Sequence, residues 1–165
     1  MCIRDSAGFV YLPGGYPELY LAALSANRQM LQSIRRYVES GGKLLAECGG
    51  MMYLCDEIRD KNGYVYPMAG VLHQSATMEN MKLRLGYRTL LYNETRLKGH
   101  EFHYSRLVEQ QNPLPSCAVA YTAKGVETDT PLYHYKNVWA GYTHLYWADP
   151  VGNEWFTKFV IDGNI

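Results

Sequence analysis

The chain has 165 residues, 47% of them hydrophobic, and its 16 Lys and Arg residues balance 16 Asp and Glu residues. This length suffices for one domain with a hydrophobic core, and a net charge of zero gives no indication of a nucleic-acid or anionic-membrane partner. No apolar run approaches the roughly 20 residues of a membrane span. The four cysteines form neither a disulfide framework nor a C-x-x-C pair, so a cytoplasmic location is expected.

The first residues look like an abrupt beginning. Residues 7–12 have the pattern of an interior strand, yet only residues 1–6 precede them, and these lack the pattern of a signal peptide. We therefore interpret residues 1–6 as a fragment start or non-native sequence, and residues 7–165 as one domain.

The first part of the domain predicts a strand–helix–strand unit. An apolar strand over residues 8–12 leads into Pro13-Gly14-Gly15, a turn whose glycines can present backbone N–H groups. Apolar residues at helical spacing predict a helix over residues 18–40, which Gly41-Gly42 ends. Residues 43–47 form the next strand. This order predicts a parallel sheet, in which sites lie beyond the carboxyl ends of the strands.

Cys48 follows the second of these strands and precedes a glycine pair and a short helix ending near Ile58. This strand–turn–helix layout is typical of a nucleophile elbow. A helix N-terminus just after the cysteine favours its thiolate. The alternative is a buried cysteine that merely ends a strand.

The middle of the chain changes character. Residues 61–64 predict a tight hairpin turn. Tyrosine-rich alternating stretches at residues 83–92 and 97–108 predict an antiparallel ribbon, and residues 117–123 predict a further strand. A last core strand over residues 138–143 delivers His144. A final helix follows Asp149-Pro150 and runs to about Ile161.

A cysteine nucleophile needs a base, for which the chain offers five histidines: His73, His100, His103, His134 and His144. His144 is the preferred partner because it follows a core strand. If residues 100–105 form a strand, His100 and His103 face opposite ways, so we expect no metal site there. Glu101, His103 and Ser105 then share one polar face.

Arginines lie on the neighbouring predicted strand. Arg84 or Arg88 could hold a carboxylate group, although each is also compatible with an ordinary surface charge.

Several stretches, in this order, resemble the C-terminal glutamine amidotransferase domain of the cobyrinate (hydrogenobyrinate) a,c-diamide synthase family. They are Leu12-Pro13-Gly14-Gly15-Tyr16-Pro17-Glu18-Leu19, Ala46-Glu47-Cys48-Gly49-Gly50-Met51-Met52-Tyr53-Leu54, Leu85-Gly86-Tyr87-Arg88, Gly99-His100-Glu101-Phe102-His103-Tyr104-Ser105 and Gly141-Tyr142-Thr143-His144-Leu145. The resemblance spans about residues 8–161.

The resemblance implies a fold and a role. The fold is α/β, with a flavodoxin-like, mostly parallel sheet flanked by helices, an antiparallel ribbon insertion, and the opening strand and helix missing. The role is hydrolysis of glutamine to supply ammonia to an ATP-dependent amidoligase domain, which amidates the a and c carboxylates of a corrinoid. That domain, with its ATP and Mg²⁺, lies outside this chain, which itself needs no cofactor.

Site residues carry over by position. Cys48 is the nucleophile, His144 its base, and the backbone N–H groups of Gly49 and of Gly14 or Gly15 form the oxyanion hole. Further candidates, for substrate binding or for orienting His144, are Glu101, Arg88, His103 and Tyr104.

One position departs from related glutaminases, which commonly place a Glu two residues after the histidine. Here that position is Tyr146, which leaves a Cys–His dyad or orientation of His144 by Glu101. The competing functions are the same domain of a cobyric acid, nickel-sirohydrochlorin or cell-wall amidating enzyme, an uncoupled cysteine hydrolase, and an inactive scaffold. The His-Glu-Phe-His-Tyr-Ser stretch favours the a,c-diamide type, and a homodimer is left open.

Overall fold

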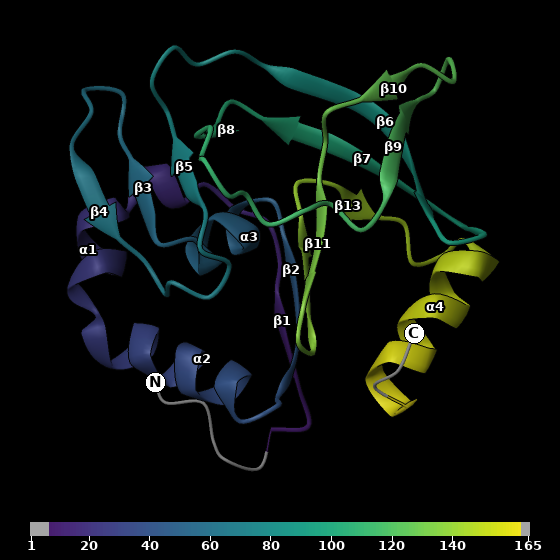
Figure 1. The fold of residues 1–165 in the computed structure, drawn as a ribbon, viewed down its shortest axis with the longest axis horizontal. Coiled ribbons are helices and arrows are strands. Elements are labelled where there is room, and N and C mark those ends of the chain that lie inside the picture. Colours follow the sequence, from purple (N-terminus) through teal and green to yellow (C-terminus); the bar gives the residue numbers. More distant parts are fainter. Residues whose placement is uncertain (1–6, 163–165) are drawn as a thin grey trace.

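A four-stranded sheet forms the centre of the molecule in the computed structural model, which describes residues 7–162. Its order is β1 (Phe9–Leu12), β2 (Lys43–Glu47), β12 (Val138–Gly141) and β11 (Leu132–Tyr135). The first three strands run parallel, and β11 is antiparallel to β12 (Figure 1). The predicted parallel unit is confirmed, and its strands end together at the edge that carries Cys48.

Helices cover both faces of this sheet. Leu44 and Ala46 of β2 pack into one buried cluster, and Leu45 packs into the other. This alternation follows from the two-residue period of a strand and buries β2 on both faces. In Figure 1, α1 (Leu21–Ala26) and α2 (Arg28–Glu39) lie on one side of the sheet and α4 (Pro150–Asp162) on the other.

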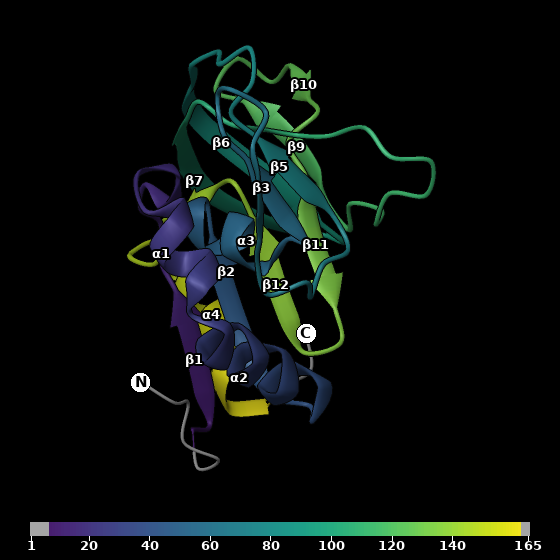
Figure 2. The same cartoon turned by 90° about the vertical axis from the view of Figure 1, so that its left-hand side faces the viewer.

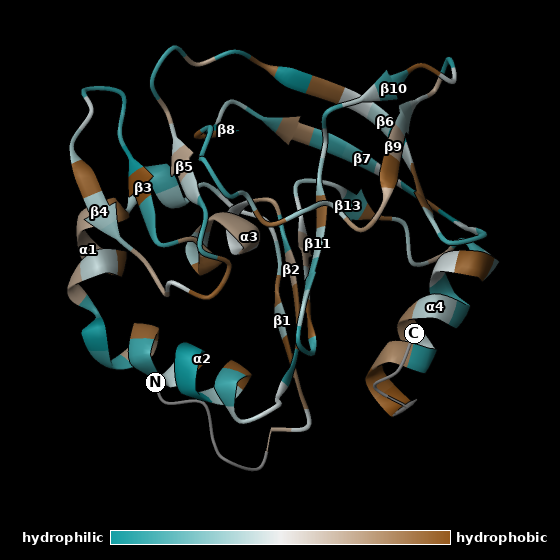
Figure 3. Cartoon of the chain, viewed as in Figure 1, coloured by the Kyte–Doolittle hydropathy of each residue, from teal (hydrophilic) through white to brown (hydrophobic). Residues whose placement is uncertain are grey.

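The predicted single helix over residues 18–40 is wrong. The chain forms a 3₁₀ turn, η1 (Pro17–Leu19), then α1 (Leu21–Ala26) and α2 (Arg28–Glu39). Asn27 interrupts the helix, because its side chain accepts a hydrogen bond from a backbone N–H in the first turn of α2. Figure 3 shows hydrophobic and hydrophilic residues interleaved along α2, as in a helix buried on one face.

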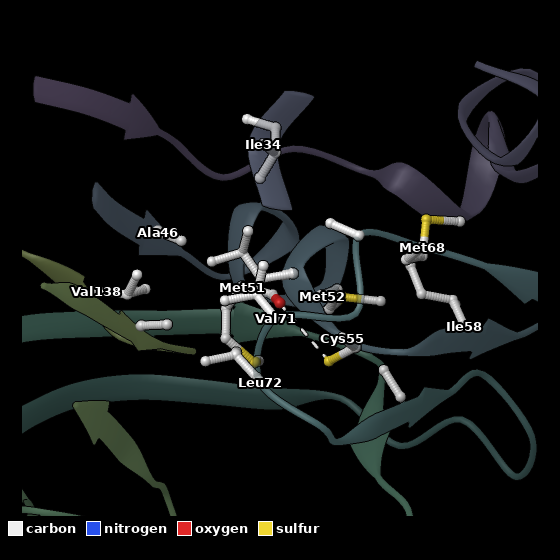
Figure 4. Close-up of a cluster of buried hydrophobic side chains, with 14 of the residues drawn as sticks. Ile34, Ala46, Met51, Met52, Cys55, Ile58, Met68, Val71, Leu72 and Val138 are labelled. Atoms are coloured by element: carbon white, nitrogen blue, oxygen red, sulfur yellow. Dashed lines mark hydrogen bonds between the residues drawn. The ribbon is translucent and has the colours of Figure 1, made fainter. Parts of the chain in front are cut away.

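The helix after Cys48 is shorter than predicted. α3 (Gly49–Leu54) ends before Ile58, which lies in β3 (Glu57–Arg59). Figure 4 shows Met51, Met52 and Cys55 in the buried cluster, with the Cys55 thiol near the Met51 carbonyl oxygen. The helix is therefore anchored by its apolar side chains.

A second, small sheet continues from α3. Its order is β4 (Val65–Pro67), β3, β5 (Ser75–Thr77) and β8 (Arg106–Leu107). The predicted hairpin at residues 61–64 joins β3 to β4 and is confirmed.

The third sheet is antiparallel, and Figure 2 shows it above the helices that flank the central sheet. Its order is β10 (Glu127–Thr128), β9 (Val119–Thr122), β6 (Arg84–Tyr92), β7 (Thr95–His103) and β13 (His144–Leu145). The predicted ribbon is thus confirmed as β6 and β7. "Mostly parallel" describes the central sheet alone, because the other strand pairs are largely antiparallel.

Two predicted strands end early. The stretch 97–108 breaks at Tyr104, because the buried Ser105 turns inward and its hydroxyl approaches the hydroxyl of Tyr142 at 3.1 Å. The last core strand ends at Gly141, and after a bend the chain joins the antiparallel sheet as β13. His144 therefore belongs to a different sheet from Cys48.

The final helix agrees with its prediction and follows directly after Asp149. Its buried residues Trp155 and Phe159 pack against Trp139 of β12 and join the central sheet to the antiparallel one. No helix among residues 7–162 is long and apolar enough to cross a membrane. The expectation for residues 1–6 lies outside the described part of the chain.

Candidate active site

Cys48 forms the turn between β2 and α3, as the sequence predicts. Its backbone has φ 49° and ψ −109°, a conformation that residues with a side chain rarely adopt. Its N–H donates to the Gly141 carbonyl at 2.8 Å, and its own carbonyl accepts the first hydrogen bond of α3 from Met52 at 3.0 Å. Such strain at a cysteine indicates a functional turn rather than a simple strand end.

The glycine pair after Cys48 permits a close approach of two chain segments. A β-carbon on Gly50 would lie 2.2 Å from the Leu12 carbonyl oxygen, and one on Gly49 would lie 2.7 Å from that of Gly15. No side chain fits at either position. The Pro-Gly-Gly loop after β1 is therefore packed directly against the start of α3.

His144 reaches this turn from β13. It pairs with His100 of β7, and the two imidazole rings stack with centroids 5.1 Å apart. A β-carbon on Gly99 would lie 2.3 Å from the His144 carbonyl oxygen, so a glycine is needed where β13 meets β7. The Cys48 sulfur lies 4.0 Å from the Phe102 carbonyl oxygen of the same strand β7. Strand β7 thus adjoins both members of the predicted Cys–His pair.

The Pro-Gly-Gly loop also touches His144. A β-carbon on Gly14 would lie 2.1 Å from Cε1 and 2.9 Å from Nε2 of the imidazole, whereas one on Gly15 would meet nothing within 4 Å. The structure therefore brings Cys48, His144, Gly14, Gly15 and Gly49 together.

Glu47 is the site residue that the sequence reasoning missed. Its Oε2 lies 3.6 Å from Nδ1 of His144, and its side chain is 4% exposed. The only local signal is a carboxylate at the end of an otherwise buried strand. The proposed orientation of His144 by Glu101 is not what the structure shows, because Glu47 occupies that place.

The electrostatics of the site favour a protonated imidazole. The interaction with Cys48, and next the one with Glu47, raises the pKa of His144 from 6.5 to about 9, against the opposing effect of burial. An imidazolium beside a cysteine favours the thiolate, which is the nucleophilic form. The arrangement can therefore attack a carbonyl carbon and then supply a proton to the leaving group.

Comparison with known proteins identifies the family. The model of the CobB/CobQ-like glutamine amidotransferase domain matches residues 2–151. The chain belongs to this family.

Curated relatives of this amidotransferase domain carry more specific names. Hydrogenobyrinate a,c-diamide synthase of Stutzerimonas stutzeri is 38% identical over 143 residues, which cover 86% of the chain and 33% of the relative. Cobyrinate a,c-diamide synthase of Dehalococcoides mccartyi is 35% identical over 161 residues, covering 89% and 34%. The domain thus spans about a third of the length of these relatives.

Solved structures support the fold of the amidotransferase domain. A crystal structure of a glutamine amidotransferase has a TM-score of 0.60 at 18% identity and covers 94% of this chain and 80% of its own. The structure of PurLQS from Thermotoga maritima has a TM-score of 0.57 at 16% identity, covering 87% and 71%.

Three of the other predicted residues, Arg88, Glu101 and His103, form a separate buried cluster. Oε2 of Glu101 lies 2.9 Å from Nη2 of Arg88 and 3.8 Å from Nε2 of His103, and Oε1 accepts from the Thr143 hydroxyl at 3.2 Å. Burial raises the pKa of Glu101, but hydrogen bonds with His103 and Thr130 and the charge of Arg88 outweigh it, so the pKa is lowered.

This cluster corrects two interpretations of the sequence. Residues 101, 103 and 105 do share a face, but that face is buried in the protein. Arg88 is bound to a carboxylate of its own chain, and so is Arg84, which pairs with Asp129. Tyr104 lies on the opposite face, partly exposed, with its ring edge against Phe102. Within residues 7–162, no group of three or more His, Cys, Asp or Glu side chains is placed to hold a metal ion.

Proposed function

We propose that this chain hydrolyses glutamine through a Cys48 thioester and delivers the ammonia to an ATP-dependent ligase that amidates the a and c carboxylates of a corrinoid. The observation that carries the glutaminase part is the strained turn at Cys48, which puts a cysteine beside an imidazole of raised pKa. Family membership supports the same chemistry.

Acylation uses both members of the pair. The Cys48 thiolate attacks the side-chain amide carbon of glutamine, and the developing oxyanion is met by the backbone N–H groups of Gly49 and of Gly14 or Gly15. The His144 imidazolium gives its proton to the amide nitrogen as the C–N bond breaks. Ammonia leaves, and a glutamyl thioester remains on Cys48.

Deacylation runs through the same groups. The now neutral His144 takes a proton from water, the resulting hydroxide attacks the thioester carbon, and the C–S bond breaks. Glutamate leaves, and the thiolate–imidazolium pair is restored. Because both half-reactions use the same oxyanion site, one set of backbone donors serves both steps.

The coupled reaction is proposed from the relatives. Those named cobyrinate or hydrogenobyrinate a,c-diamide synthase extend over about three times the matched length, which leaves room for an amidoligase part. That part would bind ATP, Mg²⁺ and the corrinoid. That part, and not residues 7–162, would then select the carboxylates to be amidated.

A labelling experiment tests the glutaminase part. We expect a diazo-ketone analogue of glutamine to alkylate Cys48 and to stop ammonia release. Cys117→Ala is the matched control, because Cys117 is a second, half-buried free cysteine distant in sequence from the site. Labelling that persists in Cys48→Ala, or that disappears in Cys117→Ala but not in Cys48→Ala, would contradict the proposal.

A coupling experiment tests the ligase part. In a full-length relative that carries the equivalent of Cys48→Ala, glutamine-dependent amidation of cobyrinate should stop while free ammonia still supports it. Loss with both nitrogen sources would reject ammonia delivery as the role of this site. Amidation of nickel-sirohydrochlorin or a cell-wall precursor in place of cobyrinate would reassign the acceptor.

A further inference from the structure

The carboxylate of Glu47 is held in place by two donors from different strands. Oε2 accepts a hydrogen bond from the Tyr11 hydroxyl of β1 at 2.7 Å, and Oε1 accepts one from the Leu145 N–H of β13 at 3.1 Å. A buried carboxylate that accepts two such bonds is fixed in orientation.

This fixed carboxylate faces the histidine. Oε2 lies 3.6 Å from Nδ1 of His144. Among residues 7–162, Glu47 is the carboxylate that forms an ion-pair contact with His144. The residue two positions after the histidine, Tyr146, is 59% exposed and carries no acid.

The turn explains how neighbours in sequence can serve one histidine. In a regular strand, residues 47 and 48 would point to opposite faces. The positive φ of Cys48 changes the direction of the chain, so that the thiol and the Glu47 carboxylate both interact with His144.

We propose that Glu47 is the positioning residue that completes a Cys48–His144–Glu47 triad, and that Tyr11 holds Glu47 in place for this role. The inference rests on the proposed glutaminase function. It adds the third residue of the triad, which comes from the strand that leads to the nucleophile.

The chemistry follows from the two ring nitrogens. An acceptor at Nδ1 keeps the proton on that nitrogen, which leaves Nε2 to exchange a proton with Cys48 and the leaving ammonia. The carboxylate also stabilises the imidazolium that each half-reaction needs. The groups facing His144 from the packed elements are Glu47 at the end of β2, Cys48 at the turn into α3, and His100 on β7.

The test compares Glu47→Gln and Tyr11→Phe with Glu39→Gln, which replaces an exposed carboxylate on α2 that is remote from the site. We expect Glu47→Gln to lower kcat on the order of 10²- to 10⁴-fold with KM changed less than about threefold. Tyr11→Phe should lower kcat by about tenfold, because Glu47 loses one of two donors. Glu39→Gln should match the wild type.

A second readout separates positioning from folding. The pKa of His144, followed by NMR of the imidazole, should fall toward 6.5 in Glu47→Gln and recover in part in Glu47→Asp, whose carboxylate is one methylene shorter. If Glu47→Gln does not fold, Tyr11→Phe provides the same comparison. A histidine titration unchanged in both variants, with kcat within threefold of wild type, would overturn the proposal.

The two proposals fail in different ways. A wild-type chain that neither releases ammonia nor reacts with the diazo-ketone would reject the glutaminase function. A chain that does both, but whose kcat and His144 titration ignore Glu47, would reject the triad alone.

Discussion

Gly14 lies against the imidazole of His144 so closely that a β-carbon at residue 14 would stand 2.1 Å from Cε1. The glycine of the Pro-Gly-Gly loop thus packs directly against the proposed base. A side chain here must displace either the loop or the histidine.

The first prediction follows from this contact. Gly14→Ala should lower the rate of glutamine hydrolysis by about 10²-fold, because a displacement of about 1 Å in a catalytic group costs that much. Gly8→Ala is the control, since a β-carbon on Gly8 meets nothing within 4 Å. Equal activity of the two variants in an ammonia-release assay would show that His144 accommodates the extra methyl group.

The second prediction concerns the strained backbone of Cys48. The free energy of unfolding of Cys48→Gly, measured in urea, should exceed that of Cys48→Ala by about 1 kcal/mol. Glycine relieves backbone strain worth about 1–3 kcal/mol, and its larger unfolded-state entropy offsets part of this gain. At most positions, an alanine variant is more stable than the glycine variant. A Cys48→Ala variant as stable as Cys48→Gly would mean that φ 49° costs nothing here.

The third prediction compares two arginines of β6. Arg88→Met should cost about 3–5 kcal/mol, because it removes the arginine that pairs with the fully buried Glu101 carboxylate. Arg84→Met should cost at most about 1 kcal/mol, because its partner Asp129 is 71% exposed. Urea unfolding of both variants measures the difference, and similar losses would refute the role of burial.

The fourth prediction is a pH dependence. The pKa of His144 is raised in the folded chain from 6.5 to about 9. A raised pKa stabilises the fold fully below pH 6.5, and the stabilisation is lost as pH rises through about 9. The free energy of unfolding should therefore fall across this window by no more than roughly 3 kcal/mol, and less so in His144→Gln.

His134 provides the control for that measurement. Burial lowers the pKa of His134, so its titration can only raise the stability as the pH rises, which is the opposite sign to the effect of His144. His134→Gln should keep the wild-type slope in this window, whatever its absolute stability. A slope that vanishes in His134→Gln and persists in His144→Gln would assign the effect to the wrong histidine.

Local patterns account for the predictions that were confirmed. The apolar strand, Cys48 and Gly49-Gly50 form a strand–turn–helix because small residues permit the turn, whatever lies elsewhere in the chain. The prediction of one helix over residues 18–40 was wrong for an equally local reason. The side chain of Asn27 caps α2, and the spacing of the apolar residues does not reveal this cap.

The amino-acid sequence alone predicted the cysteine and the histidine that the structure brings together, because an elbow cysteine and a histidine after a buried strand are recognisable from their neighbours along the chain. Only the tertiary structure decided what surrounds them. After β12 the chain leaves the central sheet, and β13 pairs with β7, which sets His144 opposite Glu47. The pairing of β6 with β7 places Glu101 with Arg88. Pairing between distant strands determines which side chains meet, and a pattern that repeats every two residues does not specify the partner strand.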